Sequence, residues 1–139
     1  MEILYYTKEA ADDAVLCRDI RWLSVGDYAV FLEHLELCGQ RILEESEWKS
    51  AYREGTVYCG LFEDGRMVAR ACVEKYSSNA WEIADVRTAR PYRDKGYAGL
   101  VCGFVLRYIL NHGKTATIRT EEDNEIMKKV IGKLGFSVL

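Results

Sequence analysis

The sequence predicts an α+β fold, in which a mixed, mostly antiparallel central sheet contains one parallel pair of strands and is flanked by helices. Two observations predict it. Period-two runs on either side of an Asp-Gly turn indicate a hairpin over residues 56–76, and another strand follows at 80–88. A long apolar segment at 96–112 has the spacing of a buried helix and leads to a short strand at 115–120. Such a crossover helix is the connection that parallel strands need.

The chain opens with one clear strand and one ambiguous stretch. Residues 2–6, EILYY, are rich in residues that favour strands. Residues 7–18 fit either a helix or a loop, and they lead into a second strand at 19–23. A length of 139 residues suits one compact domain over 1–139.

Two helices are predicted between the second strand and the hairpin. Residues 24–39 have apolar residues at helical spacing, with Ser24 as the N-cap and a glycine at the end. A short amphipathic helix at 46–55 has Ser46 as a possible cap and also ends at a glycine.

The turn of the hairpin also predicts a register. With a two-residue type I′ turn, Glu63 faces Arg66 and Cys59 faces Arg70. Cys59 and Cys72 are then not opposed, which disfavours a disulfide between them.

The last predicted helix begins at Asn124, which can cap it. Its apolar residues are expected on one buried face: Ile126, Val130, Ile131 and Leu134.

Composition excludes several classes of protein. The net charge of −3 argues against general nucleic-acid binding. The five cysteines are odd in number and widely spaced, which favours reduced thiols in the cytoplasm, and no metal-binding pattern accompanies them. The most apolar run, residues 97–110, is too short to span a membrane.

Positive charge is concentrated between the strand at 80–88 and the helix that follows. The segment contains three cations and then three small residues: Arg90, Arg93, Lys95, Gly96, Ala98 and Gly99. The first turn of a helix presents unpaired N–H groups that attract anions, and small residues let an anion approach the backbone. The pattern predicts a cradle for a pyrophosphate. The same residues also fit a solvated basic loop before an ordinary core helix.

Two motifs in this context resemble the GNAT superfamily of N-acetyltransferases. RDKGYA, residues 93–98, is similar to that family's pyrophosphate loop, Gln/Arg-x-x-Gly-x-Gly/Ala. NEIMKKVIGKLGF, residues 124–136, is similar to its last helix, which ends in LGF. The resemblance covers residues 56–136 well, and the N-terminal third matches only in the order of its elements.

The resemblance implies a sheet that splays between the strands at 80–88 and 115–120, with acetyl-CoA bound in the cleft as the acyl donor. The pantetheine arm would pair with strand backbone, and the pyrophosphate would rest on the N–H groups of residues 94–99. The residues so assigned to the cofactor are Val86, Arg87, Thr88, Arg93, Asp94, Lys95, Gly96, Tyr97, Ala98, Gly99 and Asn124. Asn124 also fits a helix cap alone.

Glu82 is the predicted catalytic residue. It lies eleven residues before Arg93, where some members of the family carry a general-base glutamate. An exposed strand carboxylate is the competing interpretation. Asp85 is the weaker candidate, because a regular strand would direct it to the opposite face from Glu82.

Two departures from the family's pattern bear on function. Ile131 stands seven residues after Asn124, where many relatives place a tyrosine that protonates the leaving thiolate. Only three residues follow LGF, whereas the family usually continues with a further strand or two. The resemblance therefore implies that the domain is unusually short, that the sequence is truncated, or that a partner chain completes the sheet. An exposed sheet edge predicts a homodimer or a covering partner.

Three functions are compatible with these patterns. The first is an acetyl-CoA-dependent N-acetyltransferase that acts on a primary amine of a small molecule or peptide. The second is a CoA-binding sensor or interaction module without catalysis, which Ile131 and the short C-terminus favour somewhat. The third is a Cys/His hydrolase, for which no nucleophile motif exists. The acceptor wall is expected near five aromatic residues, whose default role is core packing: Trp22, Tyr28, Phe31, Trp48 and Tyr52. The acidic chain mildly favours a cationic acceptor.

Overall fold

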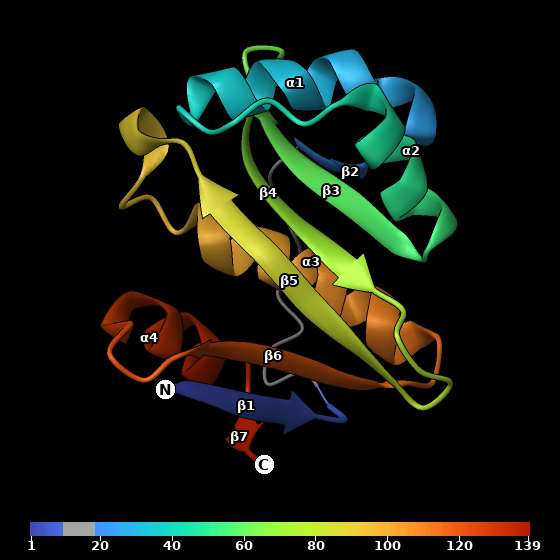
Figure 1. The fold of residues 1–139 in the computed structure, drawn as a ribbon. Helices are drawn as coiled ribbons and strands as arrows, with labels where there is room; N and C mark the ends of the chain where they lie inside the picture. The colour runs from blue at the N-terminus through green and yellow to red at the C-terminus, as the bar shows by residue number, and fades with distance from the viewer. Residues whose placement is uncertain (10–18) are drawn as a thin grey trace.

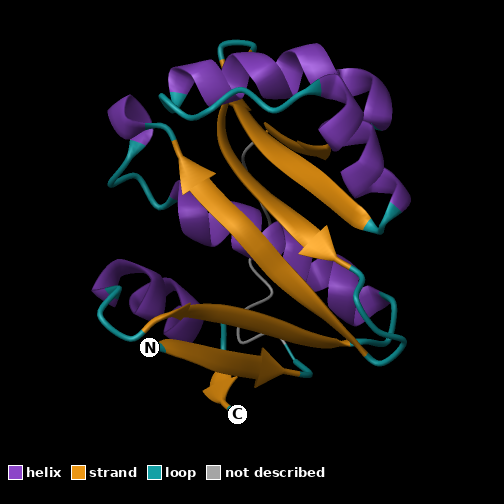
Figure 2. Ribbon diagram, viewed as in Figure 1, coloured by secondary structure: helices purple, strands orange, loops and turns teal. Residues whose placement is uncertain are grey.

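The computed structural model describes residues 1–9 and 19–139, which form one seven-stranded sheet with helices on both faces (Figures 1 and 2). The order across the sheet is β2-β3-β4-β5-β6-β1-β7. β5 and β6 are parallel, and the other neighbouring strands are antiparallel. The predicted α+β fold is therefore confirmed. The strands are β1 Glu2–Thr7, β2 Asp19–Trp22, β3 Thr56–Glu63, β4 Arg66–Glu74, β5 Ala80–Thr88, β6 Thr115–Glu121 and β7 Ser137–Val138. Most of the ambiguous stretch at 7–18 lies outside the described residues.

Each face of the sheet has its own buried cluster. α1 (Tyr28–Leu37) and α2 (Glu45–Arg53) cover one face, where Phe31 and Trp48 pack against Met67. α3 (Tyr97–Asn111) and α4 (Glu125–Lys133) cover the other, where Val105 and Ile131 belong to a larger cluster. α3 runs behind β4 and β5 in Figure 1. Short 3₁₀ helices at Val25–Asp27 and Arg90–Tyr92 precede α1 and α3.

The predicted hairpin is present as β3 and β4, but its predicted register is wrong beyond the first pairs. Glu63 pairs with Arg66 as expected. An extra residue on β4 then forms a bulge near residue 62, which shifts all later pairs by one. Cys59 consequently faces Ala71, and Arg70 faces Gly60.

The parallel pair splays as predicted. β5 and β6 are in register from Ala80 opposite Thr115 to Ile83 opposite Ile118, and then they separate. β5 continues to Thr88 beside β4, with a second bulge opposite residue 71. The edge of β5 that faces β6 therefore presents unpaired backbone groups from residue 84 onward, which is the arrangement that an extended ligand needs.

The N-terminal strand occupies the position beside β6. β1 pairs along its whole length with β6, from Glu2 opposite Glu121 to Thr7 opposite Ala116. On its other side β1 pairs with the two residues of β7. The predicted homodimer depended on a sheet edge left open by the short C-terminus. β1 covers β6, but β7 pairs only with Tyr5 and Tyr6 of β1, so the homodimer stays a prediction.

Two details of the predicted helices are wrong. The cap of α2 is Glu44, whose backbone N–H donates to the Glu47 carboxylate at 3.1 Å, so Ser46 lies inside the helix. Ile126 in α4 is 73% exposed, although it was expected on the buried face with Ile131, which is 0% exposed. The first turn of α4 borders the splay instead of the core. Within the described part of the chain, no helix has the length and apolar character to cross a membrane.

Candidate functional site

The loop between β5 and α3 is shaped around its backbone. Gly96 is the N-cap of α3 with φ +79°, and Asp94 before it also has a positive φ of 64°. A Cβ atom at Gly96 or Gly99 would meet no heavy atom within 4 Å. The space in front of the first turn of α3 is therefore open to a ligand, as the cradle requires.

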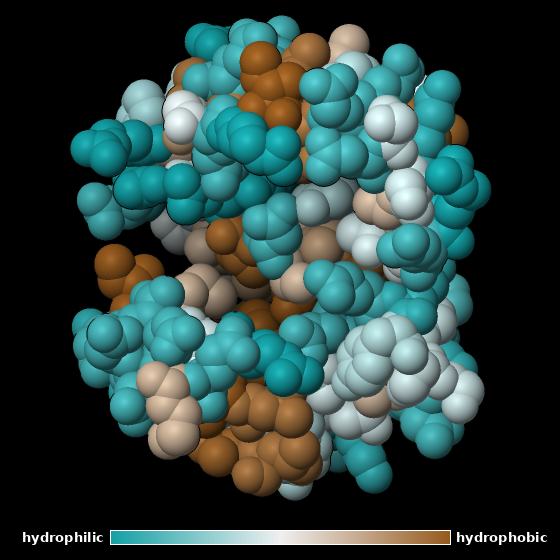
Figure 3. All heavy atoms as spheres, in the orientation of Figure 1, coloured by the Kyte–Doolittle hydropathy of each residue, from teal (hydrophilic) through white to brown (hydrophobic). Residues whose placement is uncertain are grey.

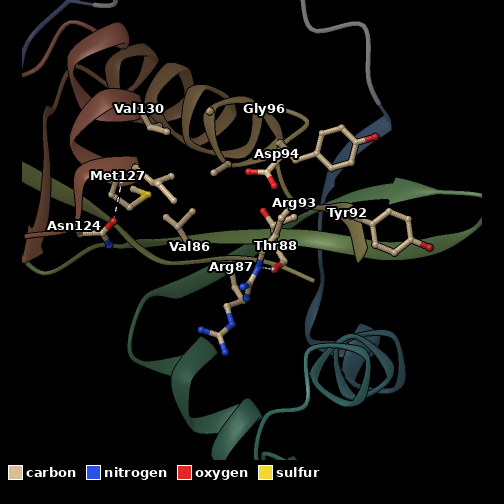
Figure 4. A pocket seen from close by; sticks show the side chains of 14 residues that line it. Val86, Arg87, Thr88, Tyr92, Arg93, Asp94, Gly96, Asn124, Met127 and Val130 are labelled. Atoms are coloured by element: carbon tan, nitrogen blue, oxygen red, sulfur yellow. Dashed lines mark hydrogen bonds between the residues drawn. The ribbon is translucent and has the colours of Figure 1, made fainter. Parts of the chain in front are cut away.

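This open space is one end of a cavity of about 340 Å³ between β5, α3 and α4. Figure 4 shows Val86 and Met127 directed toward each other across it, with Asp94 and Gly96 at the α3 end. The cavity is lined by Val86, Arg87, Thr88, Tyr92, Arg93, Asp94, Gly96, Tyr97, Ala98, Gly99, Asn124, Ile126, Met127 and Val130. All the predicted cofactor residues except Lys95 are among them.

Lys95 does not line the cavity, and its Nζ lies over the ring of Tyr92, 5.4 Å from the ring centroid. Tyr97 contributes backbone only: its side chain is 2% exposed, and its hydroxyl donates to Glu63 at 2.7 Å. Arg93 donates through Nε to the Thr88 carbonyl at 3.0 Å, which ties the loop to the end of β5.

Asn124 has the predicted role as a helix cap. Its side-chain oxygen accepts from the Met127 N–H at 3.1 Å. Three lining residues were not predicted from the sequence to belong to the site: Ile126, Met127 and Val130. Helical spacing carries the signal for the last two, since Met127 is three positions after Asn124 and Val130 is three positions after Met127, and residues three apart are neighbours on the surface of a helix.

A second cavity, of about 190 Å³, lies in the splay between β5 and β6. It shares Val86, Asn124 and Met127 with the first cavity. The two form a continuous path along the unpaired edge of β5. The lining of the second is Ile83, Ala84, Asp85, Val86, Ile118, Arg119, Thr120, Asn124 and Met127.

Glu82 lines neither of these cavities. Both of its carboxylate oxygens lie 3.1 Å from Nε of Arg119, and the Thr117 hydroxyl contacts one of them at 3.3 Å. The Glu82 side chain is 12% exposed. These contacts hold β5 to β6 just before the strands separate.

Asp85, the weaker candidate from the sequence, lines the cavity in the splay. The bulge in β5 gives Asp85 a φ of +50°, which turns its side chain onto the α1 face. Glu82 is on that face as well, so the prediction that the two lie on opposite faces is wrong. The Asp85 carboxylate accepts from the Tyr58 hydroxyl at 2.6 Å and pairs with the Arg70 guanidinium at 2.8 Å.

A third cavity, of about 280 Å³, opens on the α1 side of the sheet. Asp85 lines both this cavity and the one in the splay. Figure 3 shows this face hollowed between the half that carries α1 and the half that carries α4, with apolar atoms on the floor. The lining is Phe31, Leu35, Gln40, Arg41, Leu43, Tyr58, Arg70 and Asp85.

The five aromatic residues expected at the acceptor wall mostly pack in the core. Only Phe31 lines the third cavity. Trp48 is 0% exposed beneath it, and Trp22 packs against Phe104 and Tyr108 of α3 on the opposite face.

Four cysteines are described, and all have free thiols: Cys38, Cys59, Cys72 and Cys102. Cys38 Sγ lies 3.5 Å from Nε2 of the buried His34, whose Nδ1 faces the Met67 carbonyl at 2.9 Å. Burial raises the pKa of Cys38 and lowers the pKa of His34 to about 4. The pair is therefore a neutral thiol and a neutral imidazole, which does not favour a hydrolase. The described residues contain no group of three or more side chains placed to hold a metal ion.

The comparisons with known proteins agree with this geometry. The model of the acetyltransferase (GNAT) family matches residues 19–136. No curated protein sequence matches the chain.

Solved structures share the fold at low identity. A putative GNAT acetyltransferase from Novosphingobium aromaticivorans is 22% identical, with a TM-score of 0.72 over 99% of this chain and 60% of that one. A GNAT acetyltransferase from Colwellia psychrerythraea is 18% identical, with a TM-score of 0.75 over 99% of this chain and 52% of that one. The chain thus spans between half and three fifths of these two proteins.

A third structure was solved with a ligand. AAC(6′)-Iy in complex with the bisubstrate analogue CoA-S-monomethyl-acetylneamine is 17% identical, with a TM-score of 0.70 over 88% of this chain and 92% of that one.

Proposed function

Because the chain belongs to the acetyltransferase (GNAT) family, whose enzymes use acetyl-CoA, we propose that it transfers an acetyl group from acetyl-CoA directly to a primary amine. The predicted resemblance to that family is confirmed by the match over residues 19–136. The observation that carries the proposal is the unpaired edge of β5, which joins the loop cavity to the cavity beside α1. We propose a small molecule or a peptide as the acceptor.

The residues of the loop cavity fit acetyl-CoA. The N–H groups of residues 94–99 suit a pyrophosphate, and the open space at Gly96 and Gly99 admits it. The backbone of Val86, Arg87 and Thr88 suits a pantetheine arm added as a strand. When bound there, acetyl-CoA supplies an acetyl group activated as a thioester.

Asp85 is proposed as the group that receives the proton of the acceptor amine, directly or through a water. The amine must be neutral to attack, so its proton has to be taken as the N–C bond forms and the C–S bond breaks. Asp85 is favoured because it lines both the splay and the third cavity. Glu82, the residue predicted from sequence, is the alternative base. The leaving thiolate takes its proton from solvent, since the usual tyrosine position holds the buried Ile131.

Ligand-dependent stability tests the cofactor. CoA at about a hundred times its dissociation constant should add about 2.7 kcal/mol to the free energy of unfolding. ATP and NAD, which lack the pantetheine arm, should add much less, as measured by thermal shift. An unchanged melting temperature with saturating CoA would contradict the proposal.

A thiol-release assay with acetyl-CoA and a panel of amines then tests catalysis. Release that depends on the amine supports transfer. CoA binding without release for any amine would favour the sensor or interaction module. The four free thiols support the further proposal of a reducing, cytoplasmic compartment.

A further inference from the structure

Two arginines stand directly opposite each other on the α1 face of the sheet. Arg70 on β4 and Arg87 on β5 are register partners across the antiparallel pair. Their side chains therefore leave the same face, and like charges in that arrangement are destabilising. Among the described residues, only the carboxylate of Asp85 forms an ion pair with either arginine. Its partner is Arg70.

Arg87 is left without such a partner. Its Nε is buried and has no hydrogen-bond partner among the described residues. Cζ of Arg70 lies 5.7 Å from the centroid of the Phe31 ring on α1, and Arg87 leaves the sheet beside Arg70 on that same face. Figure 4 shows the Arg87 side chain extending away from Val86 and Met127 in the cofactor cavity. Because an unpaired buried N–H costs free energy, a group that accepts from Arg87 would be stabilising.

The third cavity, which is lined by Arg70, the register partner of Arg87, and not by Arg87 itself, also has an excess of positive charge. Its lining contains two arginines, Arg41 and Arg70, and a single carboxylate, Asp85, which Arg70 already binds. Arg41 is 76% exposed and forms an ion pair with Glu47, which does not line the cavity, at 3.6 Å. The local charge is thus opposite in sign to the net charge of the chain, which is −3.

The rest of the cavity is apolar. Phe31, Leu35, Leu43 and Tyr58 line it, and its volume of about 280 Å³ lies near the lower limit for small-molecule sites. Gln40 accepts from Arg70 at 2.7 Å and fixes the loop between α1 and α2 at the rim. The site therefore has room for a compact molecule with one apolar part.

Resting on the proposed acetyl transfer, we propose that the acceptor is a compact amine that also carries an anionic group, an apolar α-amino acid being the simplest example. Arg87 binds the anionic group, the amine lies at Asp85, and the apolar part lies in the cavity beside α1. Arg41, at the exposed rim, attracts the anion. A polyamine acceptor is disfavoured, because it would bring further positive charge to three arginines.

The experiment compares acceptors that differ only at the anionic group. The acceptors are L-leucine, L-leucinamide and 3-methylbutylamine, with O-phosphoethanolamine against ethanolamine to separate a carboxylate from a phosphate. A charge-assisted hydrogen bond corresponds to about a tenfold to hundredfold difference in affinity. We expect kcat/KM for an acidic acceptor to exceed that of its neutral counterpart by that factor.

Arg87→Met keeps much of the aliphatic volume and removes the charge. It should erase the preference for the acid. Arg87→Lys should restore part of the preference. Arg53→Met is the matched control, because Arg53 is an exposed arginine on α2.

Two results would overturn the inference. One is equal kcat/KM for acidic and neutral acceptors in the unaltered protein. The other is a loss in Arg87→Met that is the same for both acceptors and accompanied by weaker CoA binding, which would assign Arg87 to the cofactor. Thermal shift of the CoA complex with each acceptor supplies a readout without turnover. Failure of transfer with every amine would instead contradict the proposed function, while a shift with leucine and none with leucinamide would still support this inference.

Discussion

The two sides of β5 present sites of different construction. Toward β6 and α3, most residues of the cofactor cavity come from one continuous stretch, residues 86–99, which is proposed to bind the cofactor through its backbone. Toward α1, the cavity next to Asp85 is made of side chains that come from α1, the loop after it, β3, β4 and β5. The first is shaped by chain direction and by small residues, and the second by pairs of charged and aromatic groups.

This difference predicts how each side responds to substitution. A site built from backbone N–H groups tolerates changes of side chain until bulk enters the ligand's space. A site built from paired side chains responds to the loss of a single oxygen or charge. The following predictions, from the largest effect to the smallest, test that distinction.

Gly96→Glu should abolish CoA binding while the domain still folds. The new side chain would extend into the open space before α3 and place a carboxylate against the pyrophosphate. We expect the loss of a measurable thermal shift with CoA. Gly96→Ala is the control: with φ +79° it costs about 1–2 kcal/mol of stability, but it should keep CoA binding. Unchanged CoA affinity in Gly96→Glu would move the cofactor site elsewhere.

Asp85→Asn should lower kcat/KM by about 10²–10⁴, which is typical for removal of a general base. Asparagine tolerates the positive φ as aspartate does, so the backbone should not change. CoA affinity should be nearly intact.

Glu82→Gln is the matched comparison, because it makes the same chemical change on the same strand. It weakens the contact with Arg119 and should cost less than tenfold in kcat/KM. A large loss in Glu82→Gln with a small one in Asp85→Asn would restore the base predicted from sequence.

The sequence predicted the cofactor side well for a physical reason. Gly96, Ala98 and Gly99 are close in sequence, and a helix start presents its N–H groups whatever the rest of the fold. The strand face of Asp85 was predicted wrongly, because side chains alternate between faces only where a strand has no bulge. Neither bulge has a signal in the sequence of its own strand. Arg70 and Arg87 are seventeen positions apart, and their opposition depends on that bulged register.

The place of β1 in the sheet could not be predicted from the sequence either. A strand prediction for residues 2–6 does not reveal which neighbour it pairs with, and the pairing with β6 is a long-range contact. The buried pair of His34 and Cys38 shares one helix, so their proximity could have been predicted from the spacing of four.

His34, a buried residue of α1 on the acceptor side of the sheet, should make the stability of the protein depend on pH. Burial lowers its pKa from 6.5 to about 4, so the folded protein holds it neutral while the unfolded chain is protonated below 6.5. Its contribution is complete above pH 6.5 and is lost as the pH falls toward 4. The loss amounts to about 2 kcal/mol at pH 5 and about 3 kcal/mol at pH 4.

Urea unfolding of the natural protein and of His34→Gln measures this loss. Glutamine can still donate to the Met67 carbonyl but does not titrate. The free energy of unfolding of the natural protein should therefore fall relative to that of His34→Gln as the pH is lowered from 7.5 to 5. A constant difference across that range would contradict the assignment.

Tyr58→Phe should give the smallest effect, on rate and not on cofactor binding. Burial raises the pKa of Tyr58, so its hydroxyl is a neutral donor to the Asp85 carboxylate, at 2.6 Å. Removing that donor leaves Arg70 alone to orient Asp85. Because a hydrogen bond of this kind contributes about 1 kcal/mol, kcat/KM should fall roughly fivefold. Tyr52→Phe is the contrast, because among the described residues the Tyr52 hydroxyl bonds only backbone groups of Leu23 and Tyr58, and Tyr52 lines none of the three cavities. It should reduce stability by about 1 kcal/mol and leave kcat/KM unchanged. Equal rates in the two variants, with equal losses of stability, would mean that Tyr58 supports the fold alone and that Asp85 needs no orientation from it.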